Sequence, residues 1–251
     1  MGVYLGSHRV KLNRAMELRT DDSVLNSIID KTISVYENPI ISEIGSYAFY
    51  NCTSLTSIDL PQVISIGNRA FYACYSLTSI NLPQATSIES YAFYSCNAVT
   101  SVSLPKVTSI GSYAFYRCSS LASVSLPQVV SIGNYAFNYC SSLTSIDLPQ
   151  TTLIGSYAFY GCNSLTSINL PKATSIGSNA FAYCYYLLSL YLMGNSVVSL
   201  ASTDVFTSTP ISTYTTSTSG VYGSIFVPAS LYSSYLTAIN WSIYSARIVS
   251  R

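Results

Sequence analysis

The chain is poor in charge, which argues against several kinds of partner. Of its 251 residues, 11 are Lys or Arg and 10 are Asp or Glu, so the formal net charge is +1 and only 8% are charged. So small a net charge gives no field that would steer the chain toward nucleic acid or an anionic membrane surface. We therefore expect no nucleic-acid partner. Ser, Thr, Asn and Tyr, including 23 tyrosines, must form the wetted surface instead.

The chain also lacks the groups that most enzymes use. His8 is the single histidine, and it stands alone in the terminal segment without a nucleophile and acid to complete a triad. Asp59 and Asp147 occupy equivalent places four repeats apart, about 19 Å at the spacing of parallel strands. That is too far for a catalytic carboxylate pair. No Gly-rich phosphate-binding motif occurs, so we expect no enzymatic activity, no cofactor and no metal ion.

Long apolar runs are absent as well. No stretch of 18 or more apolar residues occurs, so we expect no insertion into a membrane. The opening MGVYLGSHR has no apolar segment as long as a secretory signal peptide requires. We expect synthesis in the cytoplasm, with either an upstream signal missing from this chain or another route out of the cell.

What the chain does contain is seven copies of a 22-residue unit, from Ile44 to about Val197. A fixed period of this length is typical of a solenoid, in which each unit stacks only on its neighbours. Each copy has one cysteine at the same place, and these are all the cysteines of the chain: Cys52, Cys74, Cys96, Cys118, Cys140, Cys162 and Cys184.

One unit shows how the repeat predicts a parallel sheet. Leu55, Ile58 and Leu60 have the L-x-x-L-x-L spacing of a leucine-rich repeat, and polar residues alternate around Ile58 as in a half-buried strand. Pro61 ends the strand because it has no N–H to donate. Residues 45–52 are expected to return through a short helical turn. The predicted fold class is a leucine-rich repeat solenoid of the α/β type, with a parallel sheet on one face, short helical turns on the other, and caps at both ends.

Phenylalanine recurs at one place of every unit and is predicted to form a core column. The rings are Phe49, Phe71, Phe93, Phe115, Phe137, Phe159 and Phe181. On the expected turn, each phenylalanine shares a face with an alanine and with the cysteine of the same unit. We expect each ring to contribute about 1.5–3 kcal/mol by burial.

The cysteines have three interpretations. A zinc site needs several ligands that converge at close spacing, which one cysteine every 22 residues does not provide. Stacked neighbours about 4.8 Å apart fall within the Cα range of a disulfide, but parallel side chains keep their Cβ atoms slightly too far apart. We favour free thiols that pack as small buried hydrophobes, which also fits synthesis in a reducing compartment.

Two columns of tyrosine flank the buried Ala–Phe pair, and we expect them to point outward or sideways on the convex side. The first is Tyr47, Tyr91, Tyr113, Tyr135 and Tyr157, and the second is Tyr50, Tyr72, Tyr94, Tyr116 and Tyr160. Two interpretations stay open. One is packing between coils with the hydroxyls in water. The other is an aromatic recognition surface for sugar rings or a partner protein, since tyrosine offers contact area at low entropic cost.

Other columns vary from repeat to repeat, as exposed positions do. The outward strand residues are Asp59, Asn81, Ser103, Ser125, Asp147, Asn169 and Tyr191. The residues before the cysteines are Asn51, Ala73, Ser95, Arg117, Tyr139, Gly161 and Tyr183. Relaxed constraint at exposed sites explains this variation, and recognition of a ligand is the alternative. As candidate binding residues we take the tyrosines of both columns except Tyr72, together with Asp59, Asn81, Asp147, Asn169 and Tyr191.

An open stack of strands exposes its edges, so both ends are predicted to be capped. We divide the chain into an N-terminal segment and cap (1–43), seven repeats (44–197) and a C-terminal cap (198–251). In the N-terminal segment, residues 3–12 are expected to form a hairpin or strand, and residues 24–29 a helix.

In the C-terminal cap, residues 201–223 are rich in Ser and Thr and are expected to be irregular. Residues 224–227 are expected to form a strand, and a helix is expected to follow Pro228 and run to Ile239. Trp241 and Ile248 are expected to pack beneath it.

The unit I-G-x-x-A-F-x-x-C-x-x-L-x-x-I-x-L-P resembles that of the BspA-type leucine-rich repeat family over roughly residues 41–193. The resemblance implies a bacterial surface or secreted protein that adheres to host proteins or to other cells, with no catalytic site. The C-terminal IFVPASLY…NWSIY is also similar to the usual ending of that family.

The opening VYLGSHRV resembles the start of phage or prophage tail-associated proteins that carry such repeats. This resemblance implies a tail protein that binds a receptor, namely a bacterial surface glycan or protein, with residues 1–43 attached to virion proteins. The expected location is thus a virion tail or the bacterial cell surface. A structural spacer, or a subunit that pairs with copies of itself as a homo-oligomer, is the further alternative.

The repeat generates a test of which columns face inward. Phe115→Ala is expected to lower the free energy of unfolding by about 3–5 kcal/mol, because it empties a core phenyl site. Cys118→Ala is expected to be much milder, and Tyr113→Ser nearly silent. Urea unfolding of the three variants measures the differences, and a severe Tyr113→Ser effect would contradict the inward and outward assignment.

Overall fold

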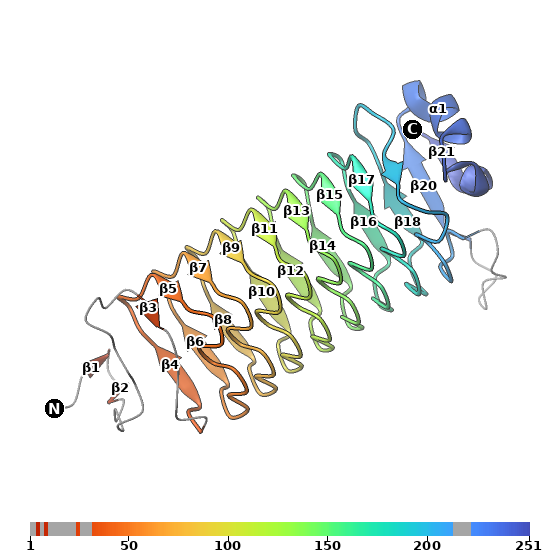
Figure 1. Cartoon of the computed structure of the whole chain (residues 1–251). Coiled ribbons are helices and arrows are strands. Elements are labelled where there is room, and N and C mark those ends of the chain that lie inside the picture. Colours follow the sequence, from red (N-terminus) through yellow and green to blue (C-terminus); the bar gives the residue numbers. More distant parts are fainter. Residues whose placement is uncertain (1–3, 6–7, 10–23, 26–31, 213–221) are drawn as a thin grey trace.

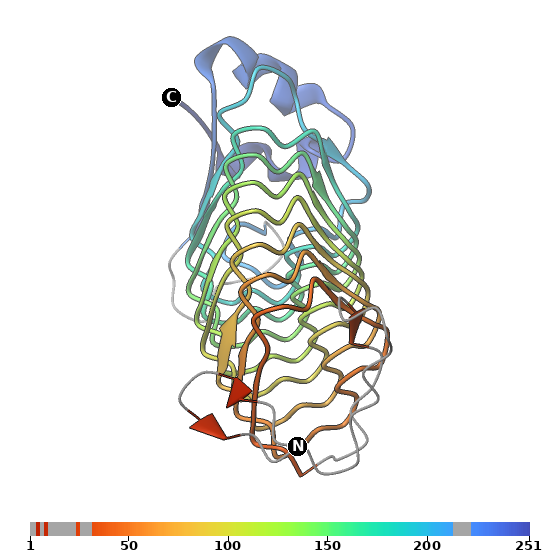
Figure 2. The same cartoon turned by 90° about the vertical axis from the view of Figure 1, so that its left-hand side faces the viewer.

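Each coil of the solenoid contributes two short strands, where the sequence predicted one (Figures 1 and 2). In the first repeat, these are β6 (Ser57–Asp59) and β7 (Ser65–Ile66). This computed structural model describes residues 4–5, 8–9, 24–25, 32–212 and 222–251. The second strand was missed because two residues are too few to show an alternating pattern.

The second strands of successive coils form one nine-stranded parallel sheet along the solenoid (Figure 1). Neighbouring strands from β5 to β17 pair at a step of 22 residues, so Ile44 lies opposite Ile66 and the isoleucines stack. In chain order, the strands are β3 (Val24–Leu25), β5 (Glu43–Ile44), β7, β9 (Ser87–Ile88), β11 (Ser109–Ile110), β13 (Ser131–Ile132), β15 (Leu153–Ile154), β17 (Ser175–Ile176) and β19 (Ser199–Leu200).

The first strands of the coils form three shorter parallel sheets, and the sequence predicted their strands except the first and the last, at residues 35–37 and 248–250. These sheets are β4 (Val35–Glu37), β6 and β8 (Ser79–Asn81); β10 (Ser101–Ser103), β12 (Ser123–Ser125) and β14 (Ser145–Asp147); and β16 (Ser167–Asn169), β18 (Ser189–Tyr191), β20 (Ser224–Val227) and β21 (Ile248–Ser250). Tyr36 of β4 pairs with Ile58 at the same 22-residue step. The stacked architecture therefore already includes the segment before Ile44.

Residues 45–52 form a series of turns, which corrects the helical turn expected there. Tyr47 and Asn51 have φ angles of 62° and 58°, and left-handed residues cannot continue a right-handed helix. The N–H groups of Tyr47, Phe49 and Asn51 donate to carbonyls of the next coil at 2.7–2.9 Å. A helix would keep these donors for itself, so hydrogen bonding between coils decides the local structure.

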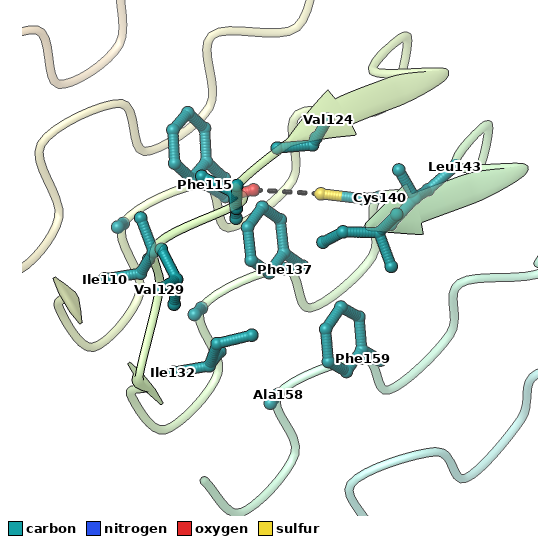
Figure 3. Close-up of a cluster of buried hydrophobic side chains, with 14 of the residues drawn as sticks. Ile110, Phe115, Val124, Val129, Ile132, Phe137, Cys140, Leu143, Ala158 and Phe159 are labelled. Carbon is teal, nitrogen blue, oxygen red and sulfur yellow. Dashed lines mark hydrogen bonds between the residues drawn. The ribbon is translucent and has the colours of Figure 1, made fainter. Parts of the chain in front are cut away.

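The phenylalanines form a continuous stack through the core, as their column predicted (Figure 3). Neighbouring ring centroids lie 4.7–5.4 Å apart, and the ring planes differ by 1–13°. Tyr36 packs edge-on against the first ring, Phe49, at 4.9 Å. Phe206 extends the stack beyond Phe181 at 5.8 Å. The apolar core is therefore one column that runs from the first described coil into the C-terminal cap.

The seven cysteines are buried free thiols, which confirms the interpretation favoured from the sequence. Six of them also have a hydrogen-bonding role that the sequence did not reveal. Their S–H groups donate to the carbonyl of the phenylalanine in the preceding coil at 3.1–3.2 Å, as for Cys140 and Phe115 (Figure 3). Each of these six thiols therefore connects two coils and is more than a small apolar filler.

At the N-terminal end, β1 (Tyr4–Leu5) and β2 (His8–Arg9) pair antiparallel, which confirms the expected hairpin. The helix expected at residues 24–29 is wrong at its start, because Val24–Leu25 is strand β3. That strand pairs in parallel with β5, so sheet pairing overrides the helical spacing of the apolar residues. Residues 26–29 lie outside the described part of the chain.

The C-terminal end forms the predicted strand β20, followed by η1 (Ala229–Leu231), α1 (Tyr232–Thr237) and η2 (Ser242–Arg247). The helix stops before Ile239, which is exposed. Trp241 is fully buried, as predicted, and its indole N–H donates to the Val198 carbonyl at 2.6 Å. The cap therefore covers the last coil and hydrogen-bonds to its backbone (Figure 1).

Close approach of neighbouring coils generates a stability prediction at Gly133. A Cβ there would lie 2.6 Å from the Ser112 nitrogen and 2.8 Å from the Gly111 carbonyl carbon. Gly133→Ala is therefore expected to lower the free energy of unfolding by about 1–3 kcal/mol, measured by urea unfolding, because backbone must shift. Glu89 occupies the equivalent position two repeats earlier. The control Glu89→Ala adds no Cβ atom, so it should change the free energy of unfolding by less than about 0.5 kcal/mol. A neutral Gly133→Ala would contradict the close contact.

Candidate recognition surface

The tyrosines of the first column stand at a left-handed position of each turn. Their φ angles are 58–62° at Tyr47, Tyr91, Tyr113, Tyr135 and Tyr157. Glycine adopts this conformation without cost, whereas a bulky residue held there costs about 1–3 kcal/mol. Because tyrosine recurs at this position, another interaction must offset the backbone strain. Stacking between the tyrosine rings provides that stabilisation.

Four of these rings, Tyr91, Tyr113, Tyr135 and Tyr157, form a stack that we call the first tyrosine ladder. Neighbouring centroids lie 4.6–4.7 Å apart with planes within 2–7° of parallel. In the second repeat Arg69 replaces the tyrosine, and its guanidinium lies 4.4 Å from the Tyr91 centroid and 5.6 Å from that of Tyr47. It also donates to the Tyr47 hydroxyl at 3.1 Å. Tyr47 therefore joins the ladder through the arginine.

Tyr50, Tyr72, Tyr94 and Tyr116 form a second tyrosine ladder, with centroids 4.5–5.1 Å apart. The ladders also touch each other within single coils. The ring pairs Tyr47–Tyr50, Tyr91–Tyr94, Tyr113–Tyr116 and Tyr157–Tyr160 lie 5.6–6.0 Å apart. The structure thus brings the tyrosines of the two columns onto one surface.

The stacking decides what this surface offers to a ligand. Within a ladder, each ring covers the faces of its neighbours, so the outer ring edges and the hydroxyls are what solvent reaches. Burial raises the pKa of Tyr113 and of Tyr135, and the neighbouring tyrosines raise it further. The hydroxyls therefore stay protonated at neutral pH and can both donate and accept hydrogen bonds. A sugar ring has no access to the covered faces of the ladder.

The ladder also corrects the expectation that Tyr113→Ser is nearly silent. Tyr113 stacks on Tyr91 at 4.7 Å and on Tyr135 at 4.6 Å. Aromatic pairs contribute about 0.5–1.5 kcal/mol each, so the loss of these two stacked pairs, together with the contact to Tyr116 at 5.6 Å, should be measurable. It remains below the expected effect of Phe115→Ala, whose ring is fully buried.

The second ladder is interrupted in the fifth repeat. Asn138 stands where the column has tyrosine, and it is only 3% exposed. The ring of the next residue, Tyr139, lies 6.4 Å from Tyr116 at 90° and 5.5 Å from Tyr160 at 79°. Tyr139 is thus turned out of the ladder. The sequence indicates this interruption, because asparagine stands at the tyrosine position and tyrosine follows it. Tyr139 was not among the candidate binding residues predicted from the sequence.

The candidates on the strands lie on a different side of the coil from the ladders. Asp59, Asn81, Asp147, Asn169 and Tyr191 are the last residues of β6, β8, β14, β16 and β18. Asn81 donates to the Asp59 carboxylate at 2.7 Å. Tyr191 stacks on Phe226 at 4.7 Å. The structure therefore divides the candidate binding residues into two surfaces, and their role in binding stays a prediction.

The described part of the chain contains neither a cluster of metal ligands nor a membrane-spanning helix. Residues 32–212 and 222–251 contain no group of three or more His, Cys, Asp or Glu side chains arranged to hold a metal ion. Among the described residues, no helix has the length and apolar character needed to cross a membrane.

The stacked parallel coils and their L-x-x-L-x-L leucines define a leucine-rich repeat protein. The family model described as BspA type leucine rich repeat region (6 copies) matches residues 42–130 and 108–226. The chain therefore belongs to the BspA-type leucine-rich repeat family, which confirms that resemblance. The family match begins after the N-terminal hairpin, and the phage-tail resemblance finds no support in these comparisons.

Two solved structures illustrate the similarity. One is the T. pallidum leucine rich repeat protein TpLRR, which is 28% identical, with 74% of this chain and 83% of that chain covered and a TM-score of 0.55. The other is a leucine rich cell surface protein from Faecalibacterium prausnitzii A2-165, which is 21% identical, with 99% and 85% covered and a TM-score of 0.55. The second likeness concerns the fold alone. No curated protein matches the chain significantly.

The buried thiols generate a prediction for alkaline pH. Burial raises the pKa of Cys118 and of Cys184 from an ordinary 9.0 to about 12. The folded chain therefore binds these protons more tightly than the unfolded chain does. The contribution of the two thiols to the free energy of unfolding is fully present below pH 9 and is lost as the pH rises toward 12. Urea midpoints measured from about pH 7 to about pH 11 should fall above pH 9. The fall should be smaller in Cys118→Ala, and a midpoint constant to pH 11 would contradict the prediction.

Proposed function

We propose that this chain is a non-enzymatic recognition module of a bacterial surface, which binds a glycan or a protein. The observation that carries the proposal is the surface built by the tyrosine ladders. A stack of rigid coils presents ring edges and phenol hydroxyls at a repeated spacing of 4.5–5.1 Å. A rigid array of aromatic and polar groups loses little entropy when it binds.

Membership of the BspA-type family supports a role in adhesion. The F. prausnitzii protein of similar fold is described as a cell surface protein, which supports display outside the cell. For these two reasons, we prefer adhesion at the cell surface as the proposed function.

A receptor-binding role on a phage tail is the alternative. It rests on the opening VYLGSHRV, part of which forms the hairpin of β1 and β2. In that role, residues 1–43 would attach to virion proteins and the solenoid would contact a bacterial surface glycan or protein. The two locations share the same binding chemistry and differ in what carries the module.

Peptide mass spectrometry of two fractions of the source strain tests the location. Washed cell-surface material and purified, induced phage particles are compared, with a cytoplasmic enzyme as the marker for lysis. We expect peptides of residues 44–197 in the surface fraction. Peptides confined to the particles would overturn the adhesin in favour of the tail protein. Purified protein that bound neither bacterial nor host cells would contradict recognition in either place.

A further inference from the structure

The interruption at residues 138–139 is expected to lower stability, because it buries a polar atom without a hydrogen-bond partner among the described residues. The Asn138 side-chain N–H donates to the Tyr157 carbonyl at 3.3 Å. Its buried oxygen has no hydrogen-bond partner among the described residues, at a cost of about 1–3 kcal/mol. A tyrosine at 138 would avoid this cost and continue the second ladder. Departures from the locally best residue concentrate at functional sites.

Gly161 in the next coil is what admits the turned ring of Tyr139. A Cβ at residue 161 would lie 2.8 Å from Cδ1 and 3.0 Å from Cε1 of Tyr139, and Gly161 has a φ of 70°. One side of the ring therefore packs on a backbone that only glycine leaves open. Tyr139 is 43% exposed, and the Arg117 guanidinium lies over its ring, 6.0 Å from the centroid. Unlike the ladder rings, Tyr139 has no parallel ring stacked on it among the described residues, because Tyr116 and Tyr160 lie at 90° and 79° to it.

An arginine without an anionic partner stands beside this ring. The Arg117 guanidinium lies 6.0 Å from the Tyr139 centroid and 5.6 Å from that of Tyr116. Within the described part of the chain, no carboxylate lies within 4.0 Å of Arg117. Arg69 differs, because its guanidinium donates to Tyr47 and Asn68 at 3.1 and 2.8 Å. Arg117 therefore keeps its donor groups for a ligand.

We propose that Tyr139 and Arg117 form a subsite for an acidic sugar, namely a carboxylate-bearing pyranose within a glycan. The aromatic face is electron-rich and attracts the polarised C–H groups of a pyranose ring. The planar guanidinium binds a carboxylate through two parallel hydrogen bonds. This inference rests on the proposed function and names the ligand class and the place where it binds.

The surroundings favour a glycan over a protein as the occupant. Ser119, Ser141 and Asn163 each lie two residues beyond Arg117, Tyr139 and Gly161, and none of them is buried. Their hydroxyl and amide groups can exchange hydrogen bonds with sugar hydroxyls. Serine is depleted in protein interfaces, which need a larger apolar centre.

Calorimetric titration with a glucuronate-containing hexasaccharide tests the subsite. Tyr139→Ser and Arg117→Asn are each expected to weaken binding at least tenfold, about 1.4 kcal/mol. Matched controls are Tyr186→Ser, an exposed tyrosine outside both ladders, and Arg247→Asn in the C-terminal cap, which should bind within about twofold of the unmodified chain. The neutral cellohexaose should bind more weakly than the acidic hexasaccharide. Absence of binding by the unmodified chain, or unchanged binding by Tyr139→Ser, overturns the proposal.

A repaired ladder separates loss of binding from loss of folding. The double variant Asn138→Tyr with Tyr139→Ser restores the tyrosine column, so it is expected to raise the urea midpoint and to lose the hexasaccharide. A variant that is stabilised and still binds refutes the role of the turned ring. Cell binding that survives both single variants assigns recognition to another surface, for a glycan or a protein, and overturns the subsite while the proposed function stands. Failure to bind any cell would instead remove the proposed function.

Discussion

Hydrogen bonding between coils is the constraint on which the rest of this molecule depends. Each coil pairs with the next through two strands and through the turn segment, where donors such as Phe49 N–H bond to the neighbouring coil at 2.7 Å. This pairing holds equivalent residues one strand spacing apart. A side chain that recurs every 22 residues must therefore contact its own copies. The phenylalanine stack, the thiol column and the tyrosine ladders all follow from it.

The core is built from one phenylalanine and one cysteine that recur in every repeat. A flat ring suits a column, because it packs face to face at 4.7–5.4 Å without a gap. The thiol beside it fills the remaining space and donates to the phenylalanine carbonyl of the coil before it, as Cys140 does to Phe115 at 3.1 Å. Tyr36 closes one end of the ring stack, and Phe206 with Trp241 closes the other. The column is thus apolar along its length and capped by aromatic residues.

On the surface, the same stacking of equivalent residues covers the tyrosine ring faces. Stacking stabilises the tyrosines but hides their faces, so a perfect ladder is a poor platform for a ring-shaped ligand. The fifth repeat departs from the pattern, with Asn138 buried and Tyr139 turned outward beside Arg117. On this surface, a tyrosine leaves the parallel stack where the repetition is broken. The departure is expected to cost stability, and such a cost is common where a stable scaffold carries a binding site.

The sequence by itself determined the period, the fold class, the buried phenylalanines and free thiols, and the strand at Ser224–Val227. These features depend on the apolar pattern within one coil, which twenty-two consecutive residues display. The tertiary structure alone decided the second strand, the left-handed turns at Tyr47 and Asn51, and the strand at Val24–Leu25. It also decided the separation of the candidate residues into two surfaces and the orientation of Tyr139 against Gly161. These features depend on hydrogen bonds and ring contacts with another coil, and no local pattern encodes a neighbour that lies one full turn away in the chain.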